Sequence, residues 1–239
     1  MERILKILIT GGNGYIGRNI GLHLSSIDEF QVTIAKRVNS KITLSDQKKI
    51  NILEIDYNSS SSLKKIISGF DIIIHCAGMD SKSCESNPNS AFEFNSLKTE
   101  KIAKIANELN VKKIINFSTA HVYKDKLSGI INESNPILNE HPYARSNHEA
   151  ERLLNEINIK NKLQCISLRL SNVIGSPIDK ECKSWNLLMN DISKQIFLDG
   201  FIKLKSDGLQ RRNFVTMSDL KRLILHLIYY DFSKEKFPI

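Results

Sequence analysis

The chain has 239 residues, of which 41% are hydrophobic and 25% charged; this composition suffices for one packed core with a small appendage and excludes wholesale disorder. Its 34 Lys and Arg residues outnumber 26 Asp and Glu, a net charge of +8 that favours anionic partners. The basic residues are spread along the chain without a stripe interleaved with aromatic residues, so a phosphate-bearing small molecule is expected rather than nucleic acid.

Other classes of protein are not expected from the residue pattern. No apolar run approaches the ~20 residues that a membrane-spanning helix requires, so no membrane association is predicted. Four scattered cysteines, without a CxxC pair or a secretory signal, predict reduced thiols in a cytoplasmic protein. No cluster of His, Cys and Asp has metal-ligand spacing, and His75 in an apolar strand is interpreted as a packed histidine.

Short apolar runs alternate with amphipathic stretches through the first 170 residues. This pattern predicts strands at 3–10, 30–35, 50–55, 71–78, 111–119 and 164–170, and helices at 14–26, 59–70, 89–110 and 143–157. Strands that are separated by helices pair in parallel through right-handed crossovers. The chain is therefore predicted to have an α/β fold, a Rossmann-type doubly wound parallel sheet.

The alternation weakens after residue 169. Helices are predicted at 184–197 and 218–230, and a short strand at 200–205. We interpret residues 1–170 as one domain and residues 171–239 as a small cap, partly interleaved with it in one structural unit.

A glycine-rich turn follows the first predicted strand and opens the first helix. Gly12, Gly14 and Gly17 form G-x-G-x-x-G, and counting from Gly11 gives G-x-x-G-x-x-G. Such a turn lets backbone N–H groups approach a pyrophosphate that the helix N-terminus then stabilises. A Walker-type phosphate loop is excluded because Arg18 and Asn19 stand where Lys and Ser or Thr are required. The turn predicts dinucleotide binding, so residues 1–170 are interpreted as a dinucleotide-binding domain and residues 171–239 as a substrate-binding cap.

The second predicted strand is followed by two cations. An NAD site normally has a carboxylate there for the ribose 2′-hydroxyl, but this chain has Lys36 and Arg37. Because a cation at this place suits a 2′-phosphate, the sequence predicts that NADP is preferred over NAD, with surface charge as the alternative role of both side chains.

Eight segments, in order along the chain, together resemble one enzyme family. They are TGGNGYIG, IDYN, FDIIIHCAG, CESNPNSAFEFN, NFSTAHVY, PYARSN and the pair RLSNVIGSP with QRRNFVTMSDL. The family that they resemble is the extended short-chain dehydrogenase/reductase family, which includes nucleotide-sugar epimerases, dehydratases and dehydrorhamnose-type reductases. The resemblance implies an NAD(P)-dependent oxidoreductase or epimerase that acts on a nucleotide-linked sugar.

The resemblance also implies a role for individual residues. Thr119 would hold the substrate oxygen, Tyr143 would exchange its proton, and Asn147 stands at the third catalytic position. Asn172 and Arg212 would contact the nucleotide sugar, with Arg211 as the alternative to Arg212 if the register slips by one. With Lys36 and Arg37, the residues implied to contact the cofactor are Gly11, Gly14, Tyr15, Ile16, Gly17, Asp56, Tyr57, Cys76, Ala77, Gly78, Asn95 and Ser118.

Two departures from the family pattern affect the chemistry. The family has a lysine where this chain has Asn147, which carries no charge to lower the pKa of Tyr143. Three interpretations stay open: a slow enzyme, a non-catalytic NADP-binding regulatory or subunit protein, or an enzyme that uses another base such as His121. Ala120 and His121 replace the acid pair of 4,6-dehydratases, so reduction or epimerisation is expected rather than elimination of water.

The end of the chain raises a further expectation. KEKFPI resembles the start of a strand that continues in relatives, yet the sequence stops at Ile239. The substrate pocket would then be open or completed by another subunit, or the sequence is a fragment. Relatives commonly pair through two helices that here would span 89–109 and 142–157, so a homodimer is expected.

Overall fold

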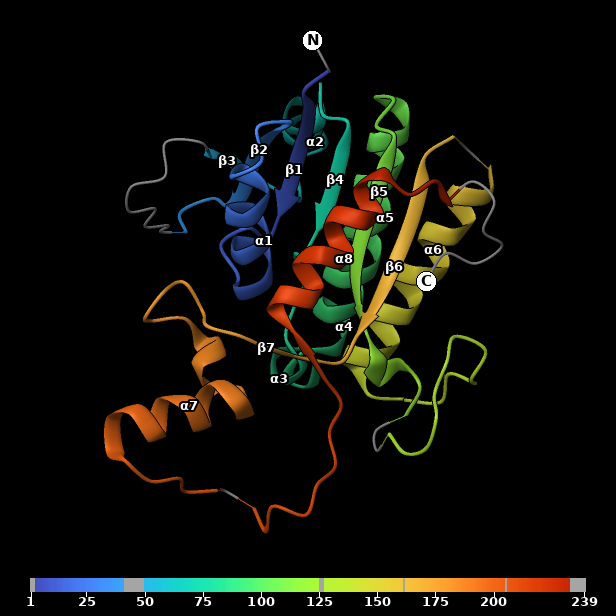
Figure 1. The fold of residues 1–239 in the computed structure, drawn as a ribbon. Coiled ribbons are helices and arrows are strands. Elements are labelled where there is room, and N and C mark those ends of the chain that lie inside the picture. The colour runs from blue at the N-terminus through green and yellow to red at the C-terminus, as the bar shows by residue number, and fades with distance from the viewer. Residues whose placement is uncertain (1–2, 41–49, 125–126, 161, 205, 233–239) are drawn as a thin grey trace.

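The computed structural model describes residues 3–40, 50–124, 127–160, 162–204 and 206–232. Six parallel strands form one sheet in the order β3-β2-β1-β4-β5-β6 (Figure 1). Their bounds are β1 Leu5–Thr10, β2 Phe30–Arg37, β3 Ile50–Ile55, β4 Ile72–His75, β5 Lys113–Thr119 and β6 Gln164–Leu170. The strand order reverses between β1 and β4, and at such a switch point a crevice opens at the carboxyl ends of the strands. The predicted α/β fold is confirmed.

Helices cover both faces of the sheet. One face carries α1 (Tyr15–Ser25) and α8 (Met217–Tyr229), and the other carries α2 (Ser60–Ile67), α5 (Lys98–Glu108) and α6 (Pro142–Lys160). Successive side chains along a strand point to opposite faces of the sheet, so each strand contributes to the hydrophobic core on both faces. Ile7 and Ile9 face α1 and α8, whereas Leu8 faces the layer of α2, α5 and α6. Strands buried on both faces explain the nearly continuous apolar runs of the sequence.

The predicted helix at 89–110 is divided into several elements. After α3 (Ser81–Ser86), the chain forms α4 (Pro88–Ala91), a π-helical segment η1 (Phe92–Leu97) and then α5. Asn95 and Ser96 are buried in η1 and bond to residues of α6. A π-helical turn inside a helix is often found at a functional site.

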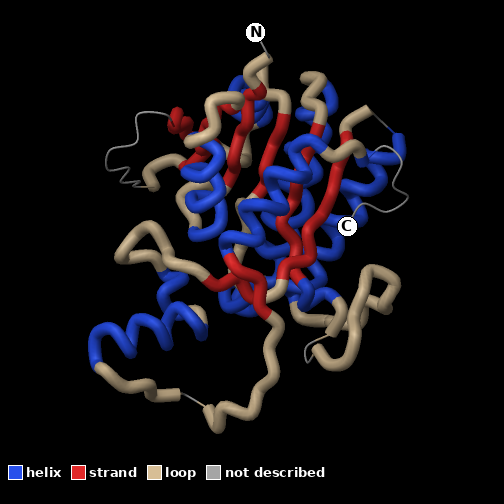
Figure 2. Tube along the Cα trace, in the orientation of Figure 1, coloured by secondary structure: helices blue, strands red, loops and turns tan. Residues whose placement is uncertain are grey.

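The connection from β6 to α8 leaves the main sheet. It contains β7 (Asn172–Ile174), the short helix η3 (Lys183–Asn186), α7 (Leu188–Asp199) and β8 (Phe214–Thr216), and β7 pairs in parallel with β8 (Figure 2). The predicted strand at 200–205 is wrong: Gly200, with φ of 76°, ends α7, and residues 201–204 pair with no strand. Lys205 lies outside the described residues. The sequence pattern did not reveal β7 and β8, because each has only three residues.

Helix α8 returns to the main sheet. Leu220, Ile224 and Leu227 enter the core beside α1. The ammonium of Lys113 on β5 donates to the carbonyls of Leu227, Ile228 and Tyr230 at 2.8, 2.8 and 2.6 Å and so anchors the end of α8. The division at residue 170 stays a prediction, and the KEKFPI segment at 234–239 lies outside the described residues.

Candidate active site

The turn between β1 and α1 is built around glycine. Gly11 has φ of +65°, and a Cβ there would lie 2.6 Å from the backbone nitrogen of Ala77 at the end of β4. A Cβ on Gly17 would lie 2.7 Å from the carbonyl oxygen of Gly11, so α1 packs directly on the turn. Gly14 caps α1 without a side-chain hydrogen bond, which leaves the first amides of the helix available to an anion.

A cavity of about 1040 Å³ opens at the carboxyl ends of the strands, between the sheet and the α7 region. It begins at the glycine turn and reaches the end of β5, the start of α6 and the segment that returns from α7. The predicted site residues that line it are Gly11, Gly14, Tyr15, Ile16, Gly17, Cys76, Ala77, Gly78, Asn95, Ser118, Thr119, Tyr143, Asn147, Asn172 and Arg212. Lys36, Arg37, Asp56 and Tyr57 are outside its lining.

Tyr143 and Thr119 meet in this cavity. Thr119 ends β5, and Tyr143 lies in the first turn of α6, where a hydrogen bond joins the two side chains. Burial raises the pKa of Tyr143, the Thr119 hydrogen bond lowers it, and the negative charge of Asp80 adds to the rise. The phenol is therefore held in its protonated form at neutral pH.

Asn147 does not replace the charge of a lysine. It lines the cavity one helical turn after Tyr143, and its Nδ2 donates to the Tyr143 carbonyl oxygen at 2.8 Å. This amide contact is made with the backbone of its own helix and brings no cation to the phenol.

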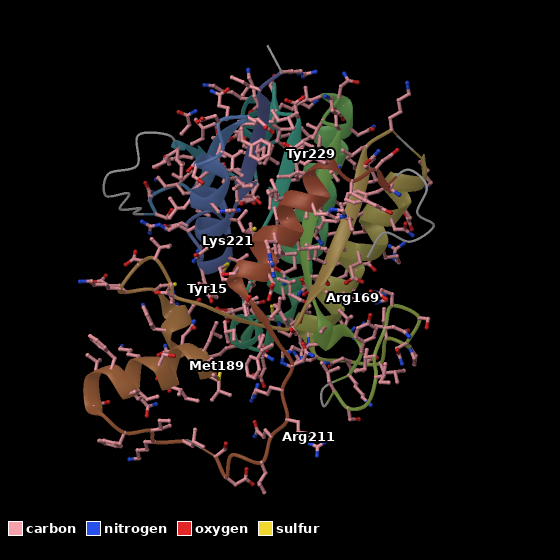
Figure 3. All side chains as sticks on the ribbon, in the orientation of Figure 1. Tyr15, Arg169, Met189, Arg211, Lys221 and Tyr229 are labelled. Atoms are coloured by element: carbon pink, nitrogen blue, oxygen red, sulfur yellow. The ribbon has the colours of Figure 1, made fainter. Side chains whose placement is uncertain are left out.

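Ser118 faces a buried ion pair. Its hydroxyl donates to Glu151, whose carboxylate pairs with Arg169 at 2.7 Å. Arg169 also donates to the Tyr123 hydroxyl at 2.9 Å, and its position on β6 is visible in Figure 3. This pair fixes the end of β5 against α6 directly behind Thr119.

The buried side chain of Asn95 is engaged by the protein. Its Oδ1 accepts from the Met79 amide at 2.8 Å, and its Nδ2 donates to the Ser146 hydroxyl at 3.0 Å. Ser146 in turn donates to the Tyr143 carbonyl at 3.2 Å. Asn95 thus joins the end of β4 to the first turn of α6, and the cofactor contact that the resemblance implies for it stays a prediction.

The four predicted residues outside the cavity lie at the ends of β2 and β3. Lys36 pairs with Glu54, and Asp56 accepts from the Asn58 amide at 2.9 Å. Tyr57 is buried, and burial raises its pKa, whereas hydrogen bonds with Thr10 and Gly11 lower it. Tyr57 therefore packs directly beneath the glycine turn.

The α7 region forms one side of the cavity. Asn172 donates to the Asn213 carbonyl at 3.0 Å, and Arg212 donates to Gln210 at 2.8 Å while lining the cavity. Arg211 lies on the segment between α7 and β8 (Figure 3) but does not line the cavity, which favours Arg212 of the two arginines.

Sequence reasoning missed several lining residues. Asp80 lines the cavity and caps α3 by accepting from the Ser83 amide at 2.8 Å; the spacing D-x-x-S after a strand could have indicated it. Gln195 and Lys203 also line the cavity, from α7 and the segment after it. Only the path of the chain brings those two residues there, so no local pattern could have found them.

Neither a metal centre nor a membrane span is found in the part of the chain that the structure describes. No group of three or more His, Cys, Asp and Glu residues there could hold a metal ion. No helix there is long and apolar enough to cross a bilayer.

Comparison with known proteins identifies related sequences over most of the chain. The model of the NAD dependent epimerase/dehydratase family matches residues 7–237. UDP-glucose 4-epimerase of Dictyostelium discoideum is 28% identical over 72% of this chain and 53% of its own length. D-erythronate dehydrogenase of Haemophilus influenzae is 24% identical over 72% and 56%. The chain spans about half the length of the curated relatives that it matches.

Solved structures show the same fold. UDP-glucuronic acid 4-epimerase from Bacillus cereus, in complex with UDP-glucuronic acid and NAD, has a TM-score of 0.81 at 20% identity and covers 98% of this chain and 75% of its own. UDP-N-acetylglucosamine 4-epimerase from Methanobrevibacter ruminantium M1 has a TM-score of 0.79 at 24% identity and covers 92% and 71%.

Proposed function

Because the chain belongs to the NAD dependent epimerase/dehydratase family, we propose that it is an NAD(P)-dependent oxidoreductase or epimerase acting on a nucleotide-linked sugar. The observation that carries the proposal is that one cavity contains both the glycine turn and the hydrogen-bonded Tyr143–Thr119 pair. The relatives and neighbours whose names specify UDP-sugars support the substrate class.

The residues at the crevice fit a dinucleotide. At Gly11 and Gly17 a Cβ would meet backbone atoms at 2.6 and 2.7 Å, so the turn is shaped for close approach, and the amides behind Gly14 suit a pyrophosphate. Small residues at the end of β4, Cys76, Ala77 and Gly78, line the same wall. When bound, the coenzyme supplies hydride acceptance and donation at a ring carbon.

Tyr143 and Thr119 hold and move the proton that accompanies the hydride. The Tyr143 hydroxyl, protonated at neutral pH, is placed to donate to an oxygen on the reacting carbon. The Oγ1 of Thr119 accepts from the His121 amide at 3.2 Å, and its hydroxyl proton stays available for donation to a substrate oxygen. These groups favour reduction of a carbonyl over removal of a proton from an alcohol.

A non-catalytic protein that binds NADP is the second candidate function. It is favoured by Asn147, whose amide contacts the helix backbone and leaves Tyr143 without a neighbouring cation. The NADP preference is part of both candidates, since Lys36 and Arg37 end β2 where NAD sites normally have a carboxylate. A cytoplasmic location, a homodimer and the absence of nucleic-acid binding stay predictions.

The two candidates are separated by binding and redox measurements on the same protein. Titration with NADPH and NADH, followed by fluorescence, is expected to give binding of both with NADPH tighter. Addition of a panel of UDP-, GDP- and dTDP-linked sugars and their keto derivatives is then expected to change the absorbance of the reduced nicotinamide. Binding with neither a redox change nor conversion of any sugar into its epimer would establish the non-catalytic candidate, and failure to bind either coenzyme would refute both.

A further inference from the structure

We propose that Glu54 determines by how much the affinity for NADP exceeds the affinity for NAD. It does so because it holds Lys36 in an ion pair and leaves Arg37 as the cation that meets a 2′-phosphate. This inference rests on the proposed coenzyme binding and assigns the specificity to a residue of β3. A carboxylate on the neighbouring strand, rather than one at the end of β2, would then tune the choice of coenzyme.

The pairing of β2 with β3 brings Lys36 and Glu54 together. The two residues lie opposite each other in the parallel register, and their side chains therefore project from the same face of the sheet. Lys36 Nζ lies 2.5 Å from Glu54 Oε1. The Lys36 side chain is only 15% exposed, whereas that of Glu54 is 50% exposed, so the carboxylate shields the ammonium from solvent and from an incoming anion.

Arg37 points to the opposite face of the sheet, since side chains alternate along a strand. That face carries Ala35 and Tyr57 in the core cluster beneath α2 and α5. The positive charge of Arg37 acts on the Tyr57 hydroxyl, which bonds to Thr10 and Gly11. Arg37 and Lys36 both lie at the carboxyl end of β2, beside the end of β1 where the glycine turn begins, and the adenosine half of a dinucleotide is expected at that end of the sheet.

The two cations also differ in their partners. Lys36 is neutralised by Glu54. No carboxylate pairs with Arg37 within the described ranges, and its residue is exposed. An exposed guanidinium that pairs with no carboxylate can donate two hydrogen bonds to a phosphate. The Lys36 ammonium would first have to leave the carboxylate of Glu54.

The test is the ratio of NADPH to NADH dissociation constants in substituted full-length protein. Glu54→Gln removes the carboxylate and releases Lys36, so NADPH affinity is expected to rise about three- to tenfold while NADH affinity is unchanged. Arg37→Gln is expected to weaken NADPH binding about tenfold and to leave NADH unchanged. Because NADH lacks the 2′-phosphate, its unchanged affinity also demonstrates that each variant is folded.

Lys36→Gln is the matched control. Alone it is expected to change NADPH affinity less than about twofold, but combined with Glu54→Gln it is expected to abolish the gain, which gives a double-mutant cycle. An unchanged coenzyme ratio in Glu54→Gln, or a loss in Lys36→Gln as large as that in Arg37→Gln, would overturn the role of Glu54. If the parent protein binds neither coenzyme, the proposed function itself fails.

Discussion

Asn147 is the residue on which the rate of the proposed reaction depends. It lies one helical turn from Tyr143, where a cation would lower the pKa of the phenol, but its amide contacts the Tyr143 carbonyl instead. Burial and Asp80 raise the pKa of Tyr143. Without a cation, little phenolate is present at neutral pH, so oxidation of an alcohol is expected to be slow.

Substitution Asn147→Lys is expected to restore this charge. The lysine would lower the pKa of Tyr143, raise kcat for oxidation of an alcohol about tenfold or more at neutral pH and move the ascending limb of the pH–rate profile to lower pH. Steady-state kinetics over a range of pH measure the change.

Tyr143→Phe is the control for this experiment, and it is expected to abolish turnover in both backgrounds. Activity that survives in Tyr143→Phe but is lost in His121→Ala would show that His121, rather than Tyr143, handles the proton.

His75 is held in one neutral tautomer by its two neighbours. The Thr99 hydroxyl donates to the Asn95 carbonyl at 2.7 Å, so it must accept from His75 Nε2–H at 2.9 Å. The unprotonated Nδ1 then accepts from the Thr10 hydroxyl at 2.6 Å. The interpretation of His75 as a packed histidine is confirmed by its burial at 3% exposure.

This burial predicts loss of stability in acid. Burial lowers the pKa of His75 from 6.5 to about 4, so the unfolded chain takes up a proton between these values and the folded protein does not. The free energy of unfolding should therefore fall by about 3 kcal/mol as the pH drops through this window and level off below it.

Urea denaturation from neutral pH to pH 4 measures the loss, and His75→Gln, which cannot titrate there, is the comparison. The variant is expected to lose about 3 kcal/mol less than the parent over the same range. Equal losses in both proteins would show that His75 does not cause the acid dependence.

At the scale of elements, the glycine turn between β1 and α1 packs its backbone against the backbone that follows β4. Gly11 has φ of +65°, and a Cβ on it would clash with the backbone of Ala77. Gly11→Ala is therefore expected to weaken binding of both coenzymes at least about tenfold, because the turn must move away from β4.

Gly69→Ala provides a matched control. Gly69 also has a positive φ, +82°, but a Cβ on it would meet nothing within 4 Å. This variant is expected to carry a similar backbone strain of about 1 kcal/mol with unchanged coenzyme affinity, measured by fluorescence titration and thermal melting. Equal losses of affinity in both variants would mean that strain, rather than the close approach at Gly11, causes the effect.

The predicted elements succeeded where local pattern and tertiary role agree. Each main-sheet strand is an apolar run with a neighbour on at least one side, and all six were predicted. Residues 200–204 have comparable apolar character but no strand of the described residues beside them, whereas Phe214–Thr216 pairs with β7. The backbone groups of a strand need hydrogen bonds to a neighbouring strand, and sequence periodicity does not reveal which segment is that neighbour.

At the scale of the whole molecule, the cavity lies between two parts of unequal packing. The sheet side is buried in two continuous cores, whereas α7 and the segment after it expose large apolar side chains, including Phe197 at 87% and Phe201 at 64%. The expected open substrate pocket would be open on the α7 side of the cavity. It stays a prediction, as does the identity of whatever completes the pocket.

The sequence by itself determined the doubly wound sheet and the glycine turn, because these depend on periodicity and on residue types at fixed spacing. The roles of the residues around Tyr143 were implied only by the resemblance to a family and stay predictions. Only the tertiary structure decided that Glu54 neutralises Lys36, that Asn147 bonds to the helix backbone and that Arg212, not Arg211, lines the cavity. The physical reason is that pairing register and side-chain direction arise from contacts between distant segments. Local sequence patterns do not encode those contacts.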